Sequence, residues 1–167
     1  MRGLARLVWP AIRFLLDRDR ARLKAAAVNE FLSGVSREQL EEEARAFAGA
    51  WSDALLRPDA LACWNAWRAR GARIVIVTAS PDIVVAPFAE ALGAEHLIGT
   101  PLAFDASGRS TGAFGGANCR GAEKVARLAQ VFGEDFELAA AYGDTRGDRE
   151  MLARARERGY KVFRLKP

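Results

Sequence analysis

The sequence predicts an α/β protein in which a helical cap at the N-terminal side precedes a three-layer core built on a parallel sheet. The pattern of the chain changes near residue 57: helical spacing dominates before this point, and short apolar runs alternate with helix-length segments after it. Such an alternation is typical of parallel strands joined by right-handed helical crossovers. We therefore expect a helical cap region over residues 1–56 and an α/β core over residues 57–167.

The cap region and the segment after it contain clear helix signals. Helical spacing runs through residues 19–33. The next helix is expected over residues 37–53, because Ser36 and a glutamine three residues later form a capping-box pattern. Pro58 stands at a first-turn position and Gly71 at a stop position, which predicts a further helix between them.

The second half of the chain alternates strands and helices. The stretch RIVIVTAS is β-branched and too short for a helix, so it predicts a buried strand over residues 73–78. A helix is expected from Pro81 to Gly93. The remaining segments, in order, are short strands at HLIG and PLAF, a hairpin turn at DASGRSTG, a helix at CRGAEKVARLAQVFG, a strand at FELAAAYGD, a helix at REMLARARERG and a last strand at KVFRL.

The composition is that of an ordinary soluble domain with a modest excess of positive charge. The net charge is +4 and the pI about 9.5, values that can accompany binding to nucleic acid or to an anionic membrane. Only four of the 25 basic residues are lysines, and the arginines are spread over the whole chain, so we expect no nucleic-acid partner. No apolar run reaches the roughly 18 residues of a membrane span.

The cysteines and the first residues bear on location. Cys63 and Cys119 stand in unrelated contexts without a CxxC motif, which favours a reducing cytoplasm. Residues 1–16 are apolar and basic and contain a tryptophan, but Arg13 interrupts the apolar stretch, so no secretion signal is expected. The expected location is cytoplasmic, with peripheral membrane contact through residues 1–16 as an alternative.

Polar residues follow the first predicted strand directly. Thr78, Ala79 and Ser80 stand between this strand and the helix that starts at Pro81. Ligands of open α/β sheets bind beyond the carboxyl ends of the strands, and a hydroxyl with backbone N–H groups beside a helix start suits a phosphate. These three residues are therefore candidates for substrate binding. The alternative is that Ser80 only caps the helix.

A lysine in a chain that otherwise uses arginine is a second candidate. Lys124 lies in the helical stretch NCRGAEKVARL. An ammonium group neutralises phosphate oxygens as a compact point charge, so Lys124 is a candidate for substrate binding and catalysis. The alternative is an ordinary solvated lysine on the helix surface.

Two aspartates follow the last apolar strand at a spacing of four residues. In YGDTRGDREML, Gly143 allows a sharp turn, Asp144 ends the strand and Asp148 falls in the first turn of the next helix. Mg²⁺ prefers one or two carboxylates together with water and phosphate oxygens, so this pair predicts a magnesium site. The alternative is that Asp148 only complements the helix N-terminus.

The order of these signals resembles the haloacid dehalogenase (HAD) superfamily, whose second, third and fourth motifs are strand-Thr, helix-Lys and strand-Gly-Asp-x-x-x-Asp. The stretches VTASPDIVVAPFAEALG, GRSTGAFGGANCRGAEKV and AYGDTRGDREML resemble its phosphoserine-phosphatase-like branch, subfamily IB. The resemblance implies a Mg²⁺-dependent phosphomonoesterase. Thr78 would hold the transferring phosphoryl group and Lys124 would neutralise it. Asp144 would bind Mg²⁺, with Asp148 supporting the metal site.

The first motif of the family, an apolar strand ending in Asp-x-Asp-Gly-Thr, has no good match. In the family its first aspartate attacks phosphorus and the second is the general acid and base. The single Asp-x-Asp here is Asp17 and Asp19, which arginine and alanine follow in place of glycine and threonine. We therefore expect the chain to begin after this motif, without the central strand that carries it between the strands ending at Thr78 and Asp144. We also expect no covalent step.

Three functions follow from these observations. The first is a HAD-type phosphatase lineage without its nucleophile, whose substrate is a small phosphomonoester such as phosphoserine or a phospholipid head group such as phosphatidylglycerophosphate. The second is a binding or regulatory module that keeps a Mg²⁺–phosphate crevice without turnover. The third is a membrane-surface protein that uses residues 1–16.

Overall fold

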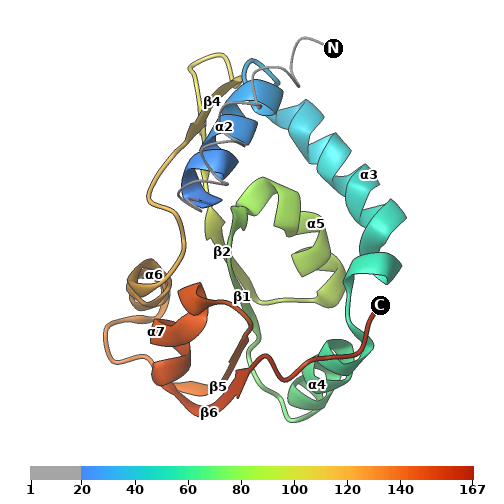
Figure 1. Cartoon of the computed structure of the whole chain (residues 1–167), viewed down its shortest axis with the longest axis vertical. Coiled ribbons are helices and arrows are strands. Elements are labelled where there is room, and N and C mark those ends of the chain that lie inside the picture. The colour runs from blue at the N-terminus through green and yellow to red at the C-terminus, as the bar shows by residue number, and fades with distance from the viewer. Residues whose placement is uncertain (1–19) are drawn as a thin grey trace.

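The computed structural model describes residues 20–167, so the predictions for residues 1–16 and for Asp17 and Asp19 lie outside it. In Figure 1 the strands of residues 75–81 and 96–100 run through the middle of the molecule, and the other strands lie nearer its left edge. The helices are α2 (Arg20–Leu32), α3 (Arg37–Leu55), α4 (Pro58–Ala69), α5 (Asp82–Leu92), α6 (Ala122–Phe132) and α7 (Arg149–Ala153). The strands are β1 (Val75–Pro81), β2 (His96–Thr100), β3 (Leu102–Phe104), β4 (Ser110–Phe114), β5 (Leu138–Gly143) and β6 (Ala155–Tyr160).

The predicted α/β class with parallel strands is confirmed. β1 pairs with β2 in parallel, β5 pairs with β6 in parallel, and β3 and β4 form the predicted antiparallel hairpin. Within residues 20–167 neither β1 nor β5 has a second partner strand, which agrees with the expected lack of a strand between them. No helix in this range is both long and apolar enough to cross a membrane.

The helix starts predicted near the N-terminal side are confirmed, although α3 shows only one of the two bonds of the predicted capping box. Ser36 is the N-cap of α3, and its hydroxyl accepts a hydrogen bond from the backbone N–H of Gln39 at 3.2 Å. Pro58 occupies the first turn of α4, where a missing N–H costs nothing. The bridge between Ser36 and Arg109 joins the start of α3 to the β3–β4 hairpin.

Two hydrophobic clusters hold the elements together. One lies under the α/β part and is made by Ile98, Cys119, Leu128, Ala141, Met151, Leu152 and Ala155. The other joins α2 and α3 to α5 and the hairpin through Val28, Leu40, Ile83 and Leu102. The second cluster therefore fixes the helices of the predicted cap against the α/β part, while the boundary near residue 57 stays a prediction.

The end of the chain differs from the prediction. The helix REMLARARERG was expected to run to Gly159 and a strand to follow at KVFRL, but α7 ends at Ala153 and β6 occupies residues 155–160. Helix propensity is a weak preference that sheet pairing can override. Here β6 pairs in parallel with β5 along Leu138–Gly143. The Tyr142 hydroxyl of β5 also donates a hydrogen bond to Glu157 of β6 at 2.5 Å.

The first strand also runs further than expected. β1 continues to Pro81, which pairs with Thr100, and α5 begins at Asp82. Pro81 is the N-cap residue of α5, and no side chain caps that helix. The alternative interpretation of Ser80 as a helix cap is therefore wrong, because Ser80 still belongs to the strand.

Candidate functional site

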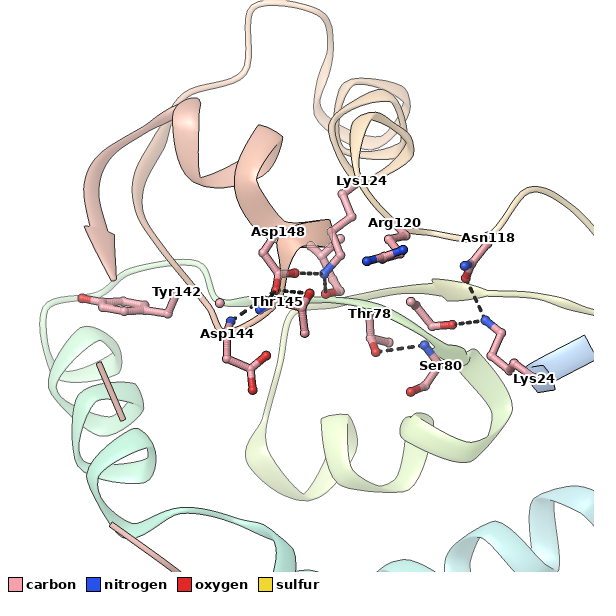
Figure 2. A pocket seen from close by; sticks show the side chains of 13 residues that line it. Lys24, Thr78, Ser80, Asn118, Arg120, Lys124, Tyr142, Asp144, Thr145 and Asp148 are labelled. Carbon is pink, nitrogen blue, oxygen red and sulfur yellow. Dashed lines mark hydrogen bonds and ion pairs between the residues drawn. The ribbon is translucent and has the colours of Figure 1, made fainter. Parts of the chain in front are cut away.

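The polar residues predicted from the sequence line one pocket of about 420 Å³. It lies where β1 and β5 end, which is the edge at which α/β proteins bind ligands (Figure 2). All six predicted residues contribute to its wall: Thr78, Ala79, Ser80, Lys124, Asp144 and Asp148. The predicted convergence of side chains thus exists, although their chemical roles stay predictions.

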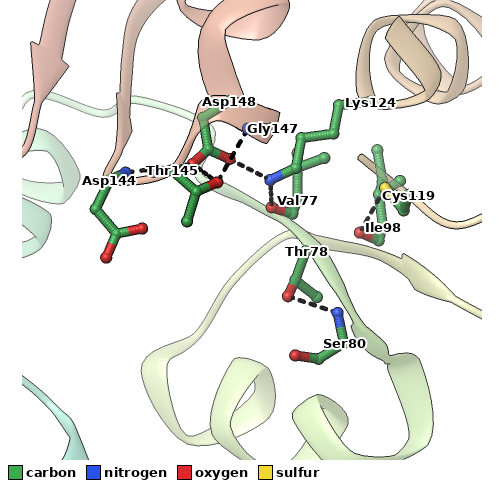
Figure 3. A network of polar contacts seen from close by, with 10 residues as sticks. All are labelled: Val77, Thr78, Ser80, Ile98, Cys119, Lys124, Asp144, Thr145, Gly147 and Asp148. Atoms are coloured by element: carbon green, nitrogen blue, oxygen red, sulfur yellow. Dashed lines mark hydrogen bonds and ion pairs between the residues drawn. The ribbon is translucent and has the colours of Figure 1, made fainter. Parts of the chain in front are cut away.

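Lys124 and Asp148 form a buried ion pair at the back of the pocket. Lys124 Nζ lies 2.7 Å from Asp148 Oδ1 and also donates to the carbonyl of Val77 at 2.6 Å (Figure 3). The two side chains are only 7% and 9% exposed. The alternative interpretation of Lys124 as a solvated surface lysine is therefore wrong.

Asp148 organises the turn between β5 and α7. Its Oδ2 accepts hydrogen bonds from the backbone N–H of Asp144 at 3.2 Å and of Thr145 at 2.9 Å, and from the Thr145 hydroxyl at 2.8 Å. Burial raises the pKa of the Asp148 carboxyl, but hydrogen bonds from Lys124 and Thr145 together lower it by more, so the pKa lies below its ordinary value. Both oxygens are engaged, which favours a supporting role over direct metal ligation.

Asp144 has the opposite environment. Its side chain is exposed and points away from Asp148 into the pocket (Figure 3). Among the described residues no side chain or N–H group bonds to its carboxylate, and no group of three or more metal-ligating side chains exists there. One free carboxylate beside an open pocket fits Mg²⁺, which takes few protein ligands and fills its remaining positions with water and phosphate oxygens.

The end of β1 presents two hydroxyl groups, those of Thr78 and Ser80. Thr78 Oγ1 accepts a hydrogen bond from the backbone N–H of Ser80 at 3.1 Å. This bond leaves the hydroxyl hydrogen of Thr78 available to a ligand oxygen, but it engages the Ser80 N–H that was expected to face a phosphate. Thr78 therefore keeps its hydroxyl hydrogen for a phosphate oxygen, whereas the backbone N–H of Ser80 is already bonded.

Sequence reasoning missed Lys24, Asn118 and Arg120, which also line the pocket. Lys24 extends from α2 and donates to the carbonyl of Ala79 at 2.6 Å and to Asn118 Oδ1 at 2.7 Å. Burial lowers the pKa of the Lys24 ammonium. The scarcity of lysine, which singled out Lys124, applies equally to Lys24 and was a usable signal; Asn118 and Arg120 carry no such signal.

Gly143 lets Asp148 approach the end of β5. A Cβ atom at Gly143 would lie 2.5 Å from Asp148 Cβ and 2.7 Å from its Cγ. We expect Gly143→Ala to push Asp148 away from Lys124 and to lower the free energy of unfolding by about 1–3 kcal/mol, as overpacking does. Chemical denaturation measures this loss.

Gly49→Ala is the matched control for this substitution. Gly49 lies inside α3, and a methyl group added there would meet no atom within 4 Å. The substitution should raise the free energy of unfolding by about 0.5–1 kcal/mol, because alanine loses less conformational entropy in a helix. Equal effects at the two glycines would contradict a steric role for Gly143.

The haloacid dehalogenase-like hydrolase family matches residues 1–153. Because this match covers most of the 167 residues, the chain belongs to the haloacid dehalogenase-like hydrolase family, as its motifs predicted. Protein CicA of Caulobacter vibrioides is 58% identical over 165 residues, which make up 99% of this chain and 74% of that protein.

Solved structures share the fold. A protein of unknown function from Bordetella pertussis Tohama I is 28% identical, with a TM-score of 0.66 over 77% of this chain. A probable phosphoserine phosphatase from Vibrio cholerae, in its unliganded form, is 20% identical, with a TM-score of 0.62 over 92% of this chain. The chain spans 60% of the first structure and 45% of the second. The likeness establishes a phosphoserine-phosphatase-like HAD fold.

Proposed function

We propose that this chain carries the phosphate and metal site of a Mg²⁺-dependent phosphomonoester hydrolase. The observation that supports the proposal best is the meeting of Thr78, Lys124 and Asp144 in one pocket at the ends of β1 and β5. In the net reaction one water molecule is consumed: the bond between phosphorus and the ester oxygen breaks, a bond between phosphorus and the water oxygen forms, and an alcohol and inorganic phosphate are released. The substrate is a small phosphomonoester or a phospholipid head group, and the expected location is cytoplasmic.

Each side chain has a role that its contacts support. Thr78 donates its free hydroxyl hydrogen to a phosphoryl oxygen. Lys124, fixed by Asp148 and by the Val77 carbonyl, balances the negative charge that develops on the phosphoryl group. Asp144 holds Mg²⁺, which when bound neutralises the phosphoryl oxygens.

The nucleophile is a separate part of the proposal. The 167-residue sequence contains no Asp-x-Asp-Gly-Thr, and Asp17 and Asp19 lie outside the described range. We therefore propose that turnover depends on the carboxylates of an Asp-x-Asp-Gly-Thr motif, whereas phosphate and Mg²⁺ binding depend on residues within the range 20–167. Binding and turnover must consequently be measured separately.

Two measurements test the proposal. Calorimetry should detect binding of inorganic phosphate to this chain that strengthens when Mg²⁺ is added. Release of inorganic phosphate from O-phosphoserine and from glycerol 3-phosphate should be weak or absent for the 167-residue chain. It should appear, and require Mg²⁺, when any in-frame upstream sequence that encodes Asp-x-Asp-Gly-Thr is included.

The outcomes separate the competing functions. Phosphate binding without turnover in every form of the protein would favour a regulatory module. No Mg²⁺-dependent phosphate binding at all would reject both the phosphatase and the module. Rapid Mg²⁺-dependent turnover by the 167-residue chain would show that the separate-nucleophile proposal is wrong.

A further inference from the structure

The pocket holds more positive charge than one phosphoryl group needs. The charge of Lys124 is balanced internally by Asp148 at 2.7 Å, whereas Lys24 and Arg120 have no carboxylate partner among residues 20–167. We propose that Lys24 and Arg120 form a second anion subsite that selects phosphomonoesters whose leaving group carries its own negative charge. This inference rests on the proposed function.

Lys24 is held in place by neutral acceptors. Its ammonium donates to the Ala79 carbonyl and to Asn118 Oδ1, and it lies 4.4 Å from the centre of the Phe114 ring. Neither oxygen carries a formal charge, so these contacts orient the ammonium without cancelling its charge. Among residues 20–167 no carboxylate bonds to Lys24, so its charge is available to an anion that enters the pocket.

The buried residue Thr100 holds the two oxygens that accept hydrogen bonds from Lys24. Thr100 has no exposed surface, and its hydroxyl lies 2.9 Å from the Ala79 carbonyl and 3.3 Å from Asn118 Oδ1. The same hydroxyl oxygen accepts the backbone N–H of Cys119 at 3.1 Å. These hydrogen bonds link the ends of β1 and β2 to the loop before α6. The two oxygens that accept from Lys24 are therefore held in fixed positions, and they orient its ammonium group.

Arg120 supplies the second cation. Its residue is exposed, its stem packs over Gly147, and no ion pair or hydrogen bond engages its guanidinium in the described part of the chain. Figure 2 shows the guanidinium inside the pocket, between Lys124 and Asn118. A guanidinium can bind a carboxylate or a phosphate through two parallel hydrogen bonds.

The two ends of the pocket differ in charge. In Figure 2 Asp144 lies at the left of the pocket and Lys24 at the far right, with Thr78 and Arg120 drawn between them. A phosphoryl group with its metal at the Asp144 side therefore leaves Lys24 to the rest of the substrate. Lys24 belongs to α2, so the predicted cap region would bind the leaving group. Residues of β1, β5 and α6 would bind the phosphoryl group.

Two matched pairs of probes test the subsite by calorimetry in the presence of Mg²⁺. O-phosphoserine is compared with O-phosphoethanolamine, which lacks only the carboxylate, and glycerophosphoglycerol phosphate with glycerol 3-phosphate, which lacks the phosphodiester. In at least one pair, the wild-type chain should bind the probe that carries the additional carboxylate or phosphodiester about tenfold more tightly. One charge-assisted hydrogen bond is worth this much. The pair that shows the preference identifies the source of the second anion.

Lys24→Met and Arg120→Met should each remove this preference and leave the binding of glycerol 3-phosphate within about twofold, a change of well under 1 kcal/mol. Lys166→Met, at an exposed position outside the pocket, is the control and should keep the preference. Arg120→Met decides the matter if Lys24→Met fails to fold, because Arg120 is exposed.

Three results would overturn the subsite. They are equal affinity within both pairs, a preference that survives both methionine variants, and an equal loss for both members of a pair. In each case the wild-type chain would still bind glycerol 3-phosphate in a Mg²⁺-dependent way, so the proposed function would stand. If none of the four probes binds, the proposed function and the subsite fail together.

Discussion

Asp148→Asn should lower the free energy of unfolding by about 3–5 kcal/mol, which is the usual cost of leaving one partner of a buried ion pair alone. The substitution removes the negative charge opposite Lys124, whose side chain is only 7% exposed. It also places an amide N–H₂ where an oxygen now accepts either from Lys124 or from Thr145. Denaturant unfolding at neutral pH measures the loss.

The effect of this substitution depends on pH in a fixed direction. In the folded chain the pKa of Asp148 lies below its ordinary value. A lowered pKa gives stabilisation that is complete above the unfolded pKa of about 4 and that disappears as the pH falls through the folded pKa. The difference in unfolding free energy between wild type and Asp148→Asn should therefore be constant near neutrality and shrink in acid.

A double variant isolates the ion pair from other effects. Lys124→Met should also destabilise the chain, because it leaves the Asp148 carboxylate without its cation. The double variant Asp148→Asn, Lys124→Met should lose less than the sum of the two single losses, with a coupling of about 0.5–3 kcal/mol. Additive losses would contradict the pair, and Asp135→Asn, at an exposed aspartate, should change stability by less than about 0.5 kcal/mol.

The predicted parts of the site share one property: each follows from local order along the chain. Thr78 and Asp144 stand directly after apolar strands, and Lys124 stands in a strongly patterned helix. Parallel strands bring their carboxyl ends to the same edge, which predicts that Thr78 and Asp144 lie close together, and the family resemblance adds Lys124 to them. The family resemblance added the chemical roles.

The parts that sequence reasoning missed depend on contacts between distant segments. Lys24 reaches Ala79 across 55 positions of sequence and Asn118 across 94, and nothing near Lys24 in the chain indicates these partners. The strand β6 was missed because ARERGY is polar and helix-compatible, while its conformation is set by pairing with β5. Such features follow from tertiary packing, which local propensity does not encode.

The interpretation of Asp148 also changed with the geometry. Its spacing from Asp144 suggested two metal ligands, but spacing cannot show which oxygens are already bonded. The structure engages both Asp148 oxygens with Lys124 and the turn, and leaves the Asp144 carboxylate without a bonded partner among residues 20–167. Asp148 therefore holds Lys124 and the turn, while the metal-binding roles of Asp144 and Asp148 stay predictions.

Asp144→Asn should abolish the effect of Mg²⁺ on phosphate binding and leave the fold intact. The Asp144 side chain is exposed, and its carboxylate has no hydrogen-bond partner within residues 20–167, so the unfolding free energy should change by less than about 0.5 kcal/mol. Affinity for inorganic phosphate in the presence of Mg²⁺ should fall by about tenfold or more, since a carboxylate is the ligand that Mg²⁺ requires here.

Asp144→Asn and Asp148→Asn therefore have opposite expected profiles. Asp144→Asn should lose Mg²⁺-dependent binding at full stability, and in a form of the protein with turnover it should lose Mg²⁺-dependent hydrolysis. Asp148→Asn should lose stability, and should lose binding only through the displacement of Lys124. If phosphate binding by Asp144→Asn still depended on Mg²⁺ to the same extent, the assignment of Asp144 as the metal ligand would be wrong. Because the amide preserves shape and changes only charge, such a result could not be attributed to misfolding.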